Sequence, residues 1–146
     1  IMKDHENSGC RKLLMDTQTT LERLKYLAEC HTGIEVMWLY GSRALGQEQS
    51  GSDFDLAIAF RELAGDPLQR QTRCDHLKFE WADELQVPDQ ALSIVDINGA
   101  PIPLAMAVVE KGYVVHSKNS LREAREENRI ASMWELDHEY YRREFG

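Results

Sequence analysis

Hydrophobic and polar positions alternate along the chain with the two periods that distinguish strands from helices. Short apolar runs rich in β-branched and aromatic residues predict four strands, at residues 34–40, 53–60, 92–97 and 113–116. Longer segments with an apolar residue every three or four positions predict four helices, at residues 13–29, 67–86, 101–110 and 120–142. This order favours an α+β fold, in which a small mixed sheet has helices packed mainly on one face and further helices at the N- and C-terminal ends.

Proline and glycine mark where several of these elements begin and end. Pro67 stands at the first position of the second helix, and Pro88 stops that helix. Gly112 directly follows the third helix, where a glycine commonly closes the last turn. No repeat, low-complexity tract or interdomain linker interrupts the pattern, so residues 1–146 are expected to form one domain.

The segment between the first two predicted strands carries the most informative polar residues. Gly41 and Ser42 directly follow the first strand, and after ten further residues come Asp53 and Asp55. Gly41 removes side-chain bulk where the phosphates of a ligand would approach the backbone. Ser42 is expected to cap a short helix at residues 43–45, which would direct N–H groups and a hydroxyl at anionic oxygens. The segment therefore predicts a turn that holds phosphate.

Asp53 and Asp55 stand two residues apart at the start of the second strand. Side chains alternate along a strand, so both carboxylates are expected on the same face. Two carboxylates placed side by side repel each other unless a divalent cation lies between them. A Gly-Ser turn and an Asp-x-Asp pair are each common alone, but their order between two apolar strands is specific. The sequence therefore predicts a metal site beside the phosphate turn.

Composition and charge restrict the classes of partner. With 146 residues, of which 42% are hydrophobic, the chain can bury the core of one ordinary domain. No apolar run approaches the roughly 18 residues that span a membrane, so no membrane partner is expected. The net charge of −8 predicts poor binding to nucleic acid and argues against a polymerase that uses a template. It favours a small nucleotide held through metal ions, or a basic protein partner.

The cysteines indicate a reducing compartment. Cys10, Cys30 and Cys74 are scattered and odd in number, without the spacing of a disulfide framework or a zinc site. A cytoplasmic location is the natural expectation.

The spacing of Gly41-Ser42, ten residues and Asp53-x-Asp55 resembles the signature of polymerase-β-type nucleotidyltransferases. The short chain is similar to their minimal members, the MntA-type adenylyltransferase antitoxins of HepT/MntA toxin–antitoxin systems. Residues 87–101 resemble the next strand of the family and its loop, and residues 103–117 resemble the helix and strand that follow. The resemblance implies a polymerase-β-like nucleotidyltransferase core at about residues 20–117, followed by a C-terminal helix at about 120–142.

The resemblance also implies an activity. An antitoxin of this type transfers AMP from ATP to a tyrosine hydroxyl of a cognate HepT-type (HEPN) ribonuclease toxin, with which it forms a hetero-oligomer. Two Mg²⁺ ions would clamp the reacting phosphate. Asp53 and Asp55 would be their ligands, and Gly41 and Ser42 would hold the phosphates. Arg43 is a candidate for assisting the leaving charge.

One position departs from the resembling family. In that family a third carboxylate lies on the strand after the long helix and helps to hold the catalytic metal. The matching residue here is Ser93, which brings no charge to a hard cation. Asp96 follows three residues later, and in a regular strand it would point to the opposite face. Asp96 is therefore either a stand-in that reaches the site through a bulge or a residue that caps a turn at the end of the strand.

Two other functions remain open. Ser93 favours an antitoxin with weakened catalysis that inhibits its toxin by binding alone. A small-molecule nucleotidyltransferase would use the same core, but 146 residues leave little room for the additional substrate-binding structure of such enzymes. An acidic surface complements the positive charge that a ribonuclease needs to attract RNA, which favours a toxin partner.

Aromatic residues gather near the end of the chain, at Trp134, Tyr140, Tyr141 and Phe145. They form either a docking face for a partner, since aromatic residues dominate the cores of interfaces, or a surface that packs back on the domain. Tyr40 is expected to be a core or half-buried packing residue.

Overall fold

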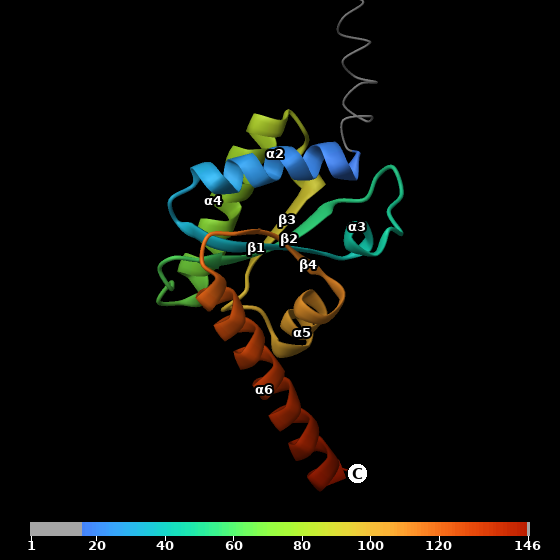
Figure 1. Cartoon of the computed structure of the whole chain (residues 1–146), viewed down its shortest axis with the longest axis vertical. Helices are drawn as coiled ribbons and strands as arrows, with labels where there is room; N and C mark the ends of the chain where they lie inside the picture. Colours follow the sequence, from blue (N-terminus) through green and yellow to red (C-terminus); the bar gives the residue numbers. More distant parts are fainter. Residues whose placement is uncertain (1–15, 146) are drawn as a thin grey trace, which may run out of the picture.

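A computed structural model describes residues 16–145 of the chain. Its strands are β1 (Ile34–Tyr40), β2 (Phe54–Phe60), β3 (Leu92–Asp96) and β4 (Tyr113–Ser117). Its helices are α2 (Thr17–Cys30), α3 (Ser42–Leu45), α4 (Pro67–Leu85), α5 (Ile102–Lys111) and α6 (Ser120–Phe145), with a single 3₁₀ turn, η1, at Asp89–Ala91. Every predicted strand and helix is present, with ends that differ by a few residues (Figure 1). The predicted start of the first helix, at residues 13–15, lies outside the described residues.

The four strands form one mixed sheet in the order β3-β2-β1-β4. Strand β1 runs antiparallel to both β2 and β4, whereas β2 and β3 are parallel. The C-terminal end of β1 and the N-terminal ends of β2 and β3 therefore meet at the same end of the sheet. The predicted α+β fold class is confirmed.

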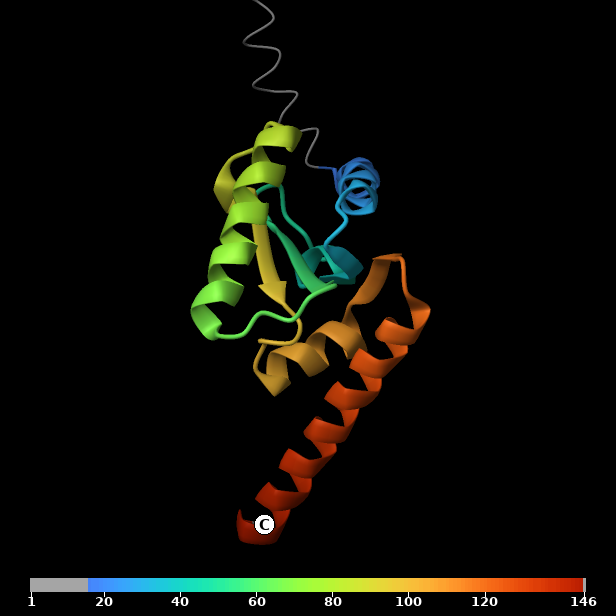
Figure 2. The ribbon, with the colours of Figure 1, turned by 90° about the vertical axis from the view of Figure 1, so that its left-hand side faces the viewer.

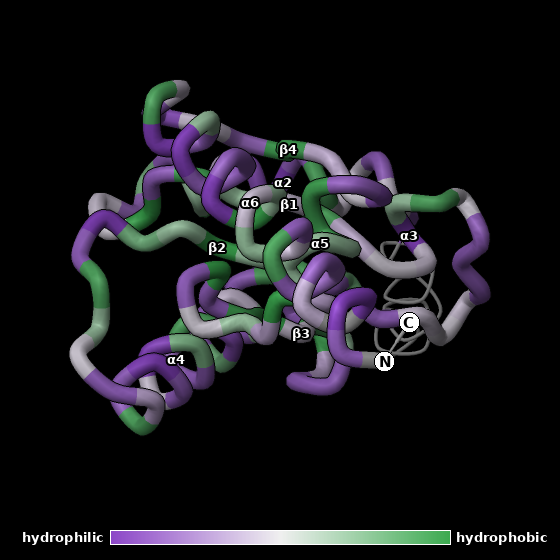
Figure 3. Tube along the Cα trace, turned by 90° about the horizontal axis from the view of Figure 1, so that it is seen from below, coloured by the Kyte–Doolittle hydropathy of each residue, from purple (hydrophilic) through white to green (hydrophobic). Residues whose placement is uncertain are grey.

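Helices cover both faces of this sheet rather than mainly one (Figure 2). On one face α2 and α4 close a core around the fully buried Trp81 and Phe54. On the other face α5 and the first half of α6 close a smaller core around Trp38 and Ile130. The prediction that helices cover mainly one face was wrong. Strands β1 and β2 carry apolar side chains on both faces of the sheet, so helices must pack on each face to bury them. Hydrophobic segments follow the strands, and hydrophilic segments lie on the outer turns of α4 (Figure 3).

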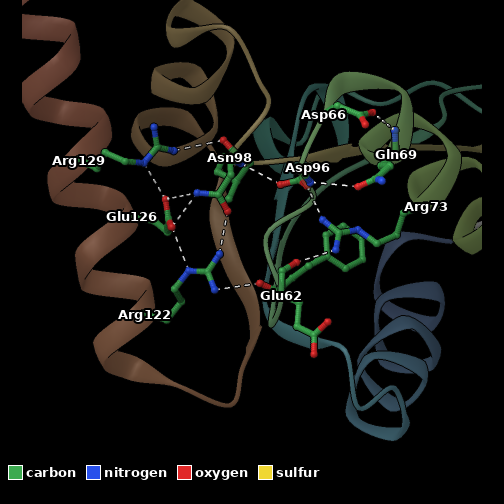
Figure 4. Close-up of polar contacts among 12 residues, drawn as sticks. Glu62, Asp66, Gln69, Arg73, Asp96, Asn98, Arg122, Glu126 and Arg129 are labelled. Atoms are coloured by element: carbon green, nitrogen blue, oxygen red, sulfur yellow. Dashed lines mark hydrogen bonds and ion pairs between the residues drawn. The ribbon is translucent and has the colours of Figure 1, made fainter.

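Hydrogen bonds and ion pairs among a group of polar side chains connect α6 with the turn after β3 (Figure 4). Glu126, which is only 6% exposed, accepts hydrogen bonds from Arg122, Arg129 and Asn98 at 2.8 to 3.0 Å. Arg122 also donates to the carbonyl of Phe60 at the end of β2, at 2.9 Å. These contacts set the direction in which the 26-residue helix leaves the domain.

The second half of α6 extends away from the rest of the molecule (Figures 1 and 2). Ile130 is fully buried, but Met133, Leu136 and Tyr140 are 42 to 63% exposed, and Trp134 is half-buried. Trp134 and Tyr140 thus do not form a surface packed back into the core. The side chains of Tyr141 and Phe145 lie outside the described residues. Within residues 16–145, no helix combines the length and apolarity needed to cross a membrane.

Candidate active site

The candidate site lies where β1 ends and β2 and β3 begin. Gly41 connects β1 to α3 with a φ of 75°, in the left-handed region that a side chain disfavours. A Cβ atom at Gly41 would overlap the Oδ2 atom of Asp55. Gly41 is therefore needed twice, for its backbone conformation and for the close approach of the Asp55 carboxylate. Ser42 is the first residue of α3, with Gly41 as its N-cap, so Ser42 is not the capping residue that the sequence predicted.

The two predicted carboxylates are brought together. Asp53 precedes β2 and Asp55 is its second residue, so the two side chains project from the same face and are close enough for the charge of Asp53 to act on Asp55. The pKa of Asp55 is raised to about 6, first by burial and then by the negative charge of Asp53. A divalent cation between the two carboxylates would remove this repulsion, and carboxylate oxygens are the ligands that Mg²⁺ prefers. The pair therefore fits one such cation.

Tyr40 and Ser93 lie on either side of Asp55 in the sheet. Tyr40 pairs with Asp55 across β1 and β2, and Asp55 pairs with Ser93 across β2 and β3. Residues paired in this way project from the same face, so the side chains of Tyr40 and Ser93 flank that of Asp55. The pKa of Tyr40 is raised to about 12, first by burial and then by the charges of Asp55 and Asp53, while the side chain of Ser93 acts in the opposite direction. Tyr40 is thus a neutral hydroxyl at pH 7.

Tyr40 is the site residue that the sequence pattern did not identify. Its apolar neighbours place it in a buried strand, and the sequence gave no sign that Tyr40 pairs with Asp55 across the sheet. The available signal was that Tyr40 is the last residue of β1, directly before Gly41.

Arg43 is buried beside the loop that leads to Asp53, although an arginine on so short a helix is usually solvated. Its guanidinium donates to the carbonyl of Ser52 at 2.8 and 3.2 Å and to the hydroxyl of Thr17 at 3.0 Å. Its Cζ atom lies 4.1 Å from the centre of the Phe54 ring. Arg43 thus holds the residues on both sides of Asp53, and these contacts support a positioning role. Its predicted contact with a leaving group stays a prediction.

Asp96 is not brought to the site. It pairs with Ile58 on β2, three residues along the strand from Asp55, and faces α4. Its carboxylate forms an ion pair with Arg73 at 2.7 Å and accepts a hydrogen bond from the backbone N–H of Asn98 at 2.9 Å (Figure 4). The bulge that would have turned Asp96 toward Asp55 is not formed, because the pairing of β2 with β3 is regular. Asp96 therefore caps the turn after β3 and lies outside the candidate site.

The site therefore combines two carboxylates with two neutral hydroxyls. Among residues 16–145, no cluster of three or more Asp, Glu, His or Cys side chains is arranged to hold a metal ion. Ser93, the residue of β3 in register with Asp55, brings no charge to this group.

The model of the polymerase beta nucleotidyltransferase family matches residues 22–121 of the chain. The chain belongs to this family. The matched segment of the chain includes every residue of the candidate site, namely Gly41, Ser42, Asp53, Asp55 and Ser93. No curated protein matches the chain.

Solved structures with the same fold come from toxin–antitoxin complexes. A toxin–antitoxin structure with AMP-PNP contains a chain 20% identical to this one, with a TM-score of 0.60, covering 88% of this chain and 92% of that chain. A mutant MntA toxin–antitoxin structure has 19% identity, a TM-score of 0.63, and coverage of 83% and 90%. The structure of a tri-AMPylated Shewanella oneidensis HEPN toxin in complex with an MNT antitoxin contains a chain 17% identical to this one. The TM-score is 0.56, and the match covers 90% of this chain and 92% of that chain. At these identities the likeness shows a shared fold.

Proposed function

We propose that this nucleotidyltransferase is an MntA-type antitoxin, which transfers AMP from ATP to a tyrosine hydroxyl of a cognate HEPN-type ribonuclease toxin. The observation that carries the proposal is the adjacent pair Asp53 and Asp55 against the glycine turn at Gly41, within a family domain that transfers nucleotides. Support for the partner comes from the fold neighbours, which include antitoxin complexes with an ATP analogue and with an AMPylated toxin.

Asp53 and Asp55 would hold Mg²⁺ together with the phosphates of ATP. The bound ion would neutralise charge on the reacting phosphate and the leaving pyrophosphate. The chain itself positions the groups: Gly41 and Ser42 offer backbone to the phosphates on the β1 side, and Arg43 holds the loop that carries Asp53. Ser93 and Tyr40 present hydroxyls beside Asp55, and Ser93 is on the β3 side, where we place the incoming tyrosine.

In the proposed transfer, the tyrosine oxygen of the toxin bonds to the α-phosphorus of ATP. The bond from that phosphorus to the β-phosphate oxygen breaks, pyrophosphate leaves, and the phenolic proton passes to solvent. An acidic chain, with a net charge of −8, complements a ribonuclease that must attract RNA. The product complex would be a hetero-oligomer of antitoxin and toxin in the cytoplasm.

The test is the intact mass of the toxin encoded beside this chain, after incubation with the chain, Mg²⁺ and ATP. We expect the toxin to gain one or more AMP units, and we expect no gain with an Asp53→Asn, Asp55→Asn variant of unchanged circular dichroism. Asp83→Asn, an exposed change on α4, is the matched control. An unmodified toxin in a reaction where the chain binds both ATP and toxin would contradict the proposal.

Ser93 favours a second candidate function, inhibition of the toxin by binding alone. Under that function the Asp53→Asn, Asp55→Asn variant would still protect cells that express the toxin, whereas under AMP transfer it would not. Growth of cells that co-express the toxin with each variant therefore distinguishes the two functions.

A further inference from the structure

The donor atoms of the candidate site do not fit two metal ions. The site offers two carboxylates, and within the described residues no third acidic, histidine or cysteine side chain joins them. Two divalent cations roughly 3.5 to 4 Å apart repel each other strongly, so paired-metal sites need anionic ligands on both sides. Asp53 and Asp55 can supply that charge to the ion that carries the nucleotide phosphates, but a second ion would find only neutral groups on its outer side.

The outer side is the position of Ser93. Ser93 is in register with Asp55 and projects from the same face of the sheet. Tyr40 is in register with Asp55 on the other neighbouring strand, so its side chain projects from the same face as those of Asp55 and Ser93. A second Mg²⁺ beside Asp55 would meet only the uncharged hydroxyl oxygens of Tyr40 and Ser93, which bind a hard cation weakly.

We propose that this site holds a single divalent cation, between Asp53 and Asp55, and that the neutral hydroxyls of Tyr40 and Ser93, on either side of Asp55 in the sheet, take the place of a second ion. The inference rests on the proposed function, since it concerns the same nucleotide site. Tyr40 and Ser93 are positioning residues in this arrangement. They hold neutral hydrogen-bonding groups next to Asp55, on the side from which an acceptor hydroxyl approaches.

The test counts Mn²⁺ ions bound to the full chain in the presence of AMP-PNP. Electron paramagnetic resonance measures free Mn²⁺ during a titration, and the protein is kept in excess over the nucleotide. We expect one ion per bound nucleotide for the wild type and two for Ser93→Asp. Ser93→Asn, which has the size of Asp without its charge, should keep one ion. Tyr40→Phe, which removes one hydroxyl and adds no charge, should also keep one.

A second pair of measurements covers the case that Ser93→Asp does not fold. Ser93→Cys places a sulfur at the same position, and a thiolate binds soft cations. With Cd²⁺ in place of Mn²⁺, we expect Ser93→Cys to bind one ion more than the wild type, while with Mn²⁺ the two proteins bind equally.

Each outcome supports or overturns the inference. Two Mn²⁺ ions on the wild type, or none, would overturn the single-ion site. A count that stays at one in Ser93→Asp, together with no added Cd²⁺ in Ser93→Cys, would overturn the role of position 93. AMP transfer to the toxin is measured separately, so two ions with transfer would overturn the inference alone. One ion without transfer would instead overturn the proposed function alone.

Discussion

Burial and a neighbouring charge both act on the carboxyl group of Asp55. Its pKa is raised to about 6 by burial and by Asp53. Because the folded-state pKa lies above the unfolded value of about 3.9, the neutral carboxyl contributes stability that is complete below about pH 4 and is lost as the pH rises through about 6. A divalent cation competes with this proton for the same oxygens, so metal binding should weaken as the pH falls below about 6.

We therefore predict that Mg²⁺ with AMP-PNP raises the melting temperature of the wild-type chain more at pH 7.5 than at pH 5.0. Asp55→Asn should remove this metal-dependent increase at both pH values, and Asp137→Asn on the exposed part of α6 should behave as the wild type. Differential scanning fluorimetry measures the shifts. Equal shifts of the wild type at the two pH values would contradict the assignment of the cation to Asp55.

Gly41 and Gly46 provide a matched pair for the glycine turn. Both have a positive φ, 75° and 69°, but only at Gly41 would a Cβ atom meet the carboxylate of Asp55, whereas no atom lies within 4 Å of a Cβ at Gly46. Gly41→Ala should lower the free energy of unfolding by about 2 to 3 kcal/mol, because it adds steric overlap to backbone strain. Gly46→Ala should cost about 1 kcal/mol, from backbone strain alone.

Chemical denaturation of the two variants measures these losses, and binding of Mg²⁺ with AMP-PNP shows their effect on the site. Only Gly41→Ala should weaken that binding. Equal losses of stability and equal binding in the two variants would mean that the contact between Gly41 and Asp55 does not matter.

At the scale of whole elements, the join between α6 and the turn after β3 depends on one buried charge. Burial alone would raise the pKa of Glu126, but hydrogen bonds from Asn98, Arg129 and Arg122 hold it below its usual value. The stability that these contacts supply is therefore present above the unfolded pKa of about 4.3 and is lost as the pH falls through the lower folded-state value.

We predict that Glu126→Ala lowers the free energy of unfolding by about 3 kcal/mol at pH 7, because it leaves two arginines without their buried partner. Glu135→Ala, on the exposed part of the same helix, should change it by less than about 0.5 kcal/mol. Urea denaturation at pH 7 and pH 3.5 measures both. The difference between Glu126→Ala and the wild type should shrink at pH 3.5, and a difference that stays constant would contradict the ionised state of Glu126.

The elements themselves could be predicted from the sequence, because period and turn residues are local properties. Strand 34–40 needed only its apolar, β-prone run, and helix 67–86 needed only the spacing of its apolar residues and the prolines at 67 and 88. The contacts between elements could not be predicted in the same way. The position of Tyr40 and Ser93 on either side of Asp55 depends on the register of three strands, and the burial of Glu126 depends on where α6 crosses the sheet. In sequence, Glu126 stands among alternating charges that are typical of a solvated helix.

The candidate site shows the same division. Asp53 and Asp55 could be predicted as neighbours because side chains two positions apart on a strand project from the same face. The prediction that Asp96 caps the turn at the end of its strand is confirmed. Side chains alternate along a strand, and this alternation already placed Asp96 on the face opposite to Ser93. The buried position of Arg43 could not be predicted in this way, because its partners, Ser52 and Thr17, lie in a loop and in another helix at no fixed spacing from it.

At the scale of the whole molecule, the chain is a folded core with a projecting helix (Figure 2). Among the α6 side chains that the structure describes, Ile130 is the last fully buried one, and those after it are exposed or half-buried. We predict that a chain ending after Ser132 keeps a melting temperature within about 2 °C of the full chain, because few buried contacts are lost. A chain ending after Glu127, which removes Arg129 and Ile130, should melt at least about 8 °C lower.

Circular dichroism melts of the two truncated chains test this division of α6. A large loss of stability on removal of residues 133–146 would mean that the projecting turns pack on the core in solution. Binding of each folded chain to the toxin then shows whether the aromatic residues of those turns are a docking face.

The contacts of Arg43 connect the local unfolding of the loop before Asp53 to that of the first turn of α2. One guanidinium joins the carbonyl of Ser52, next to Asp53, to the hydroxyl of Thr17, the first residue of α2. A ligand that orders Asp53 therefore also secures the start of a helix on the opposite face of the sheet. Amide hydrogen exchange should slow in both places together when nucleotide and metal bind, so that the loop and the helix end behave as one cooperative unit.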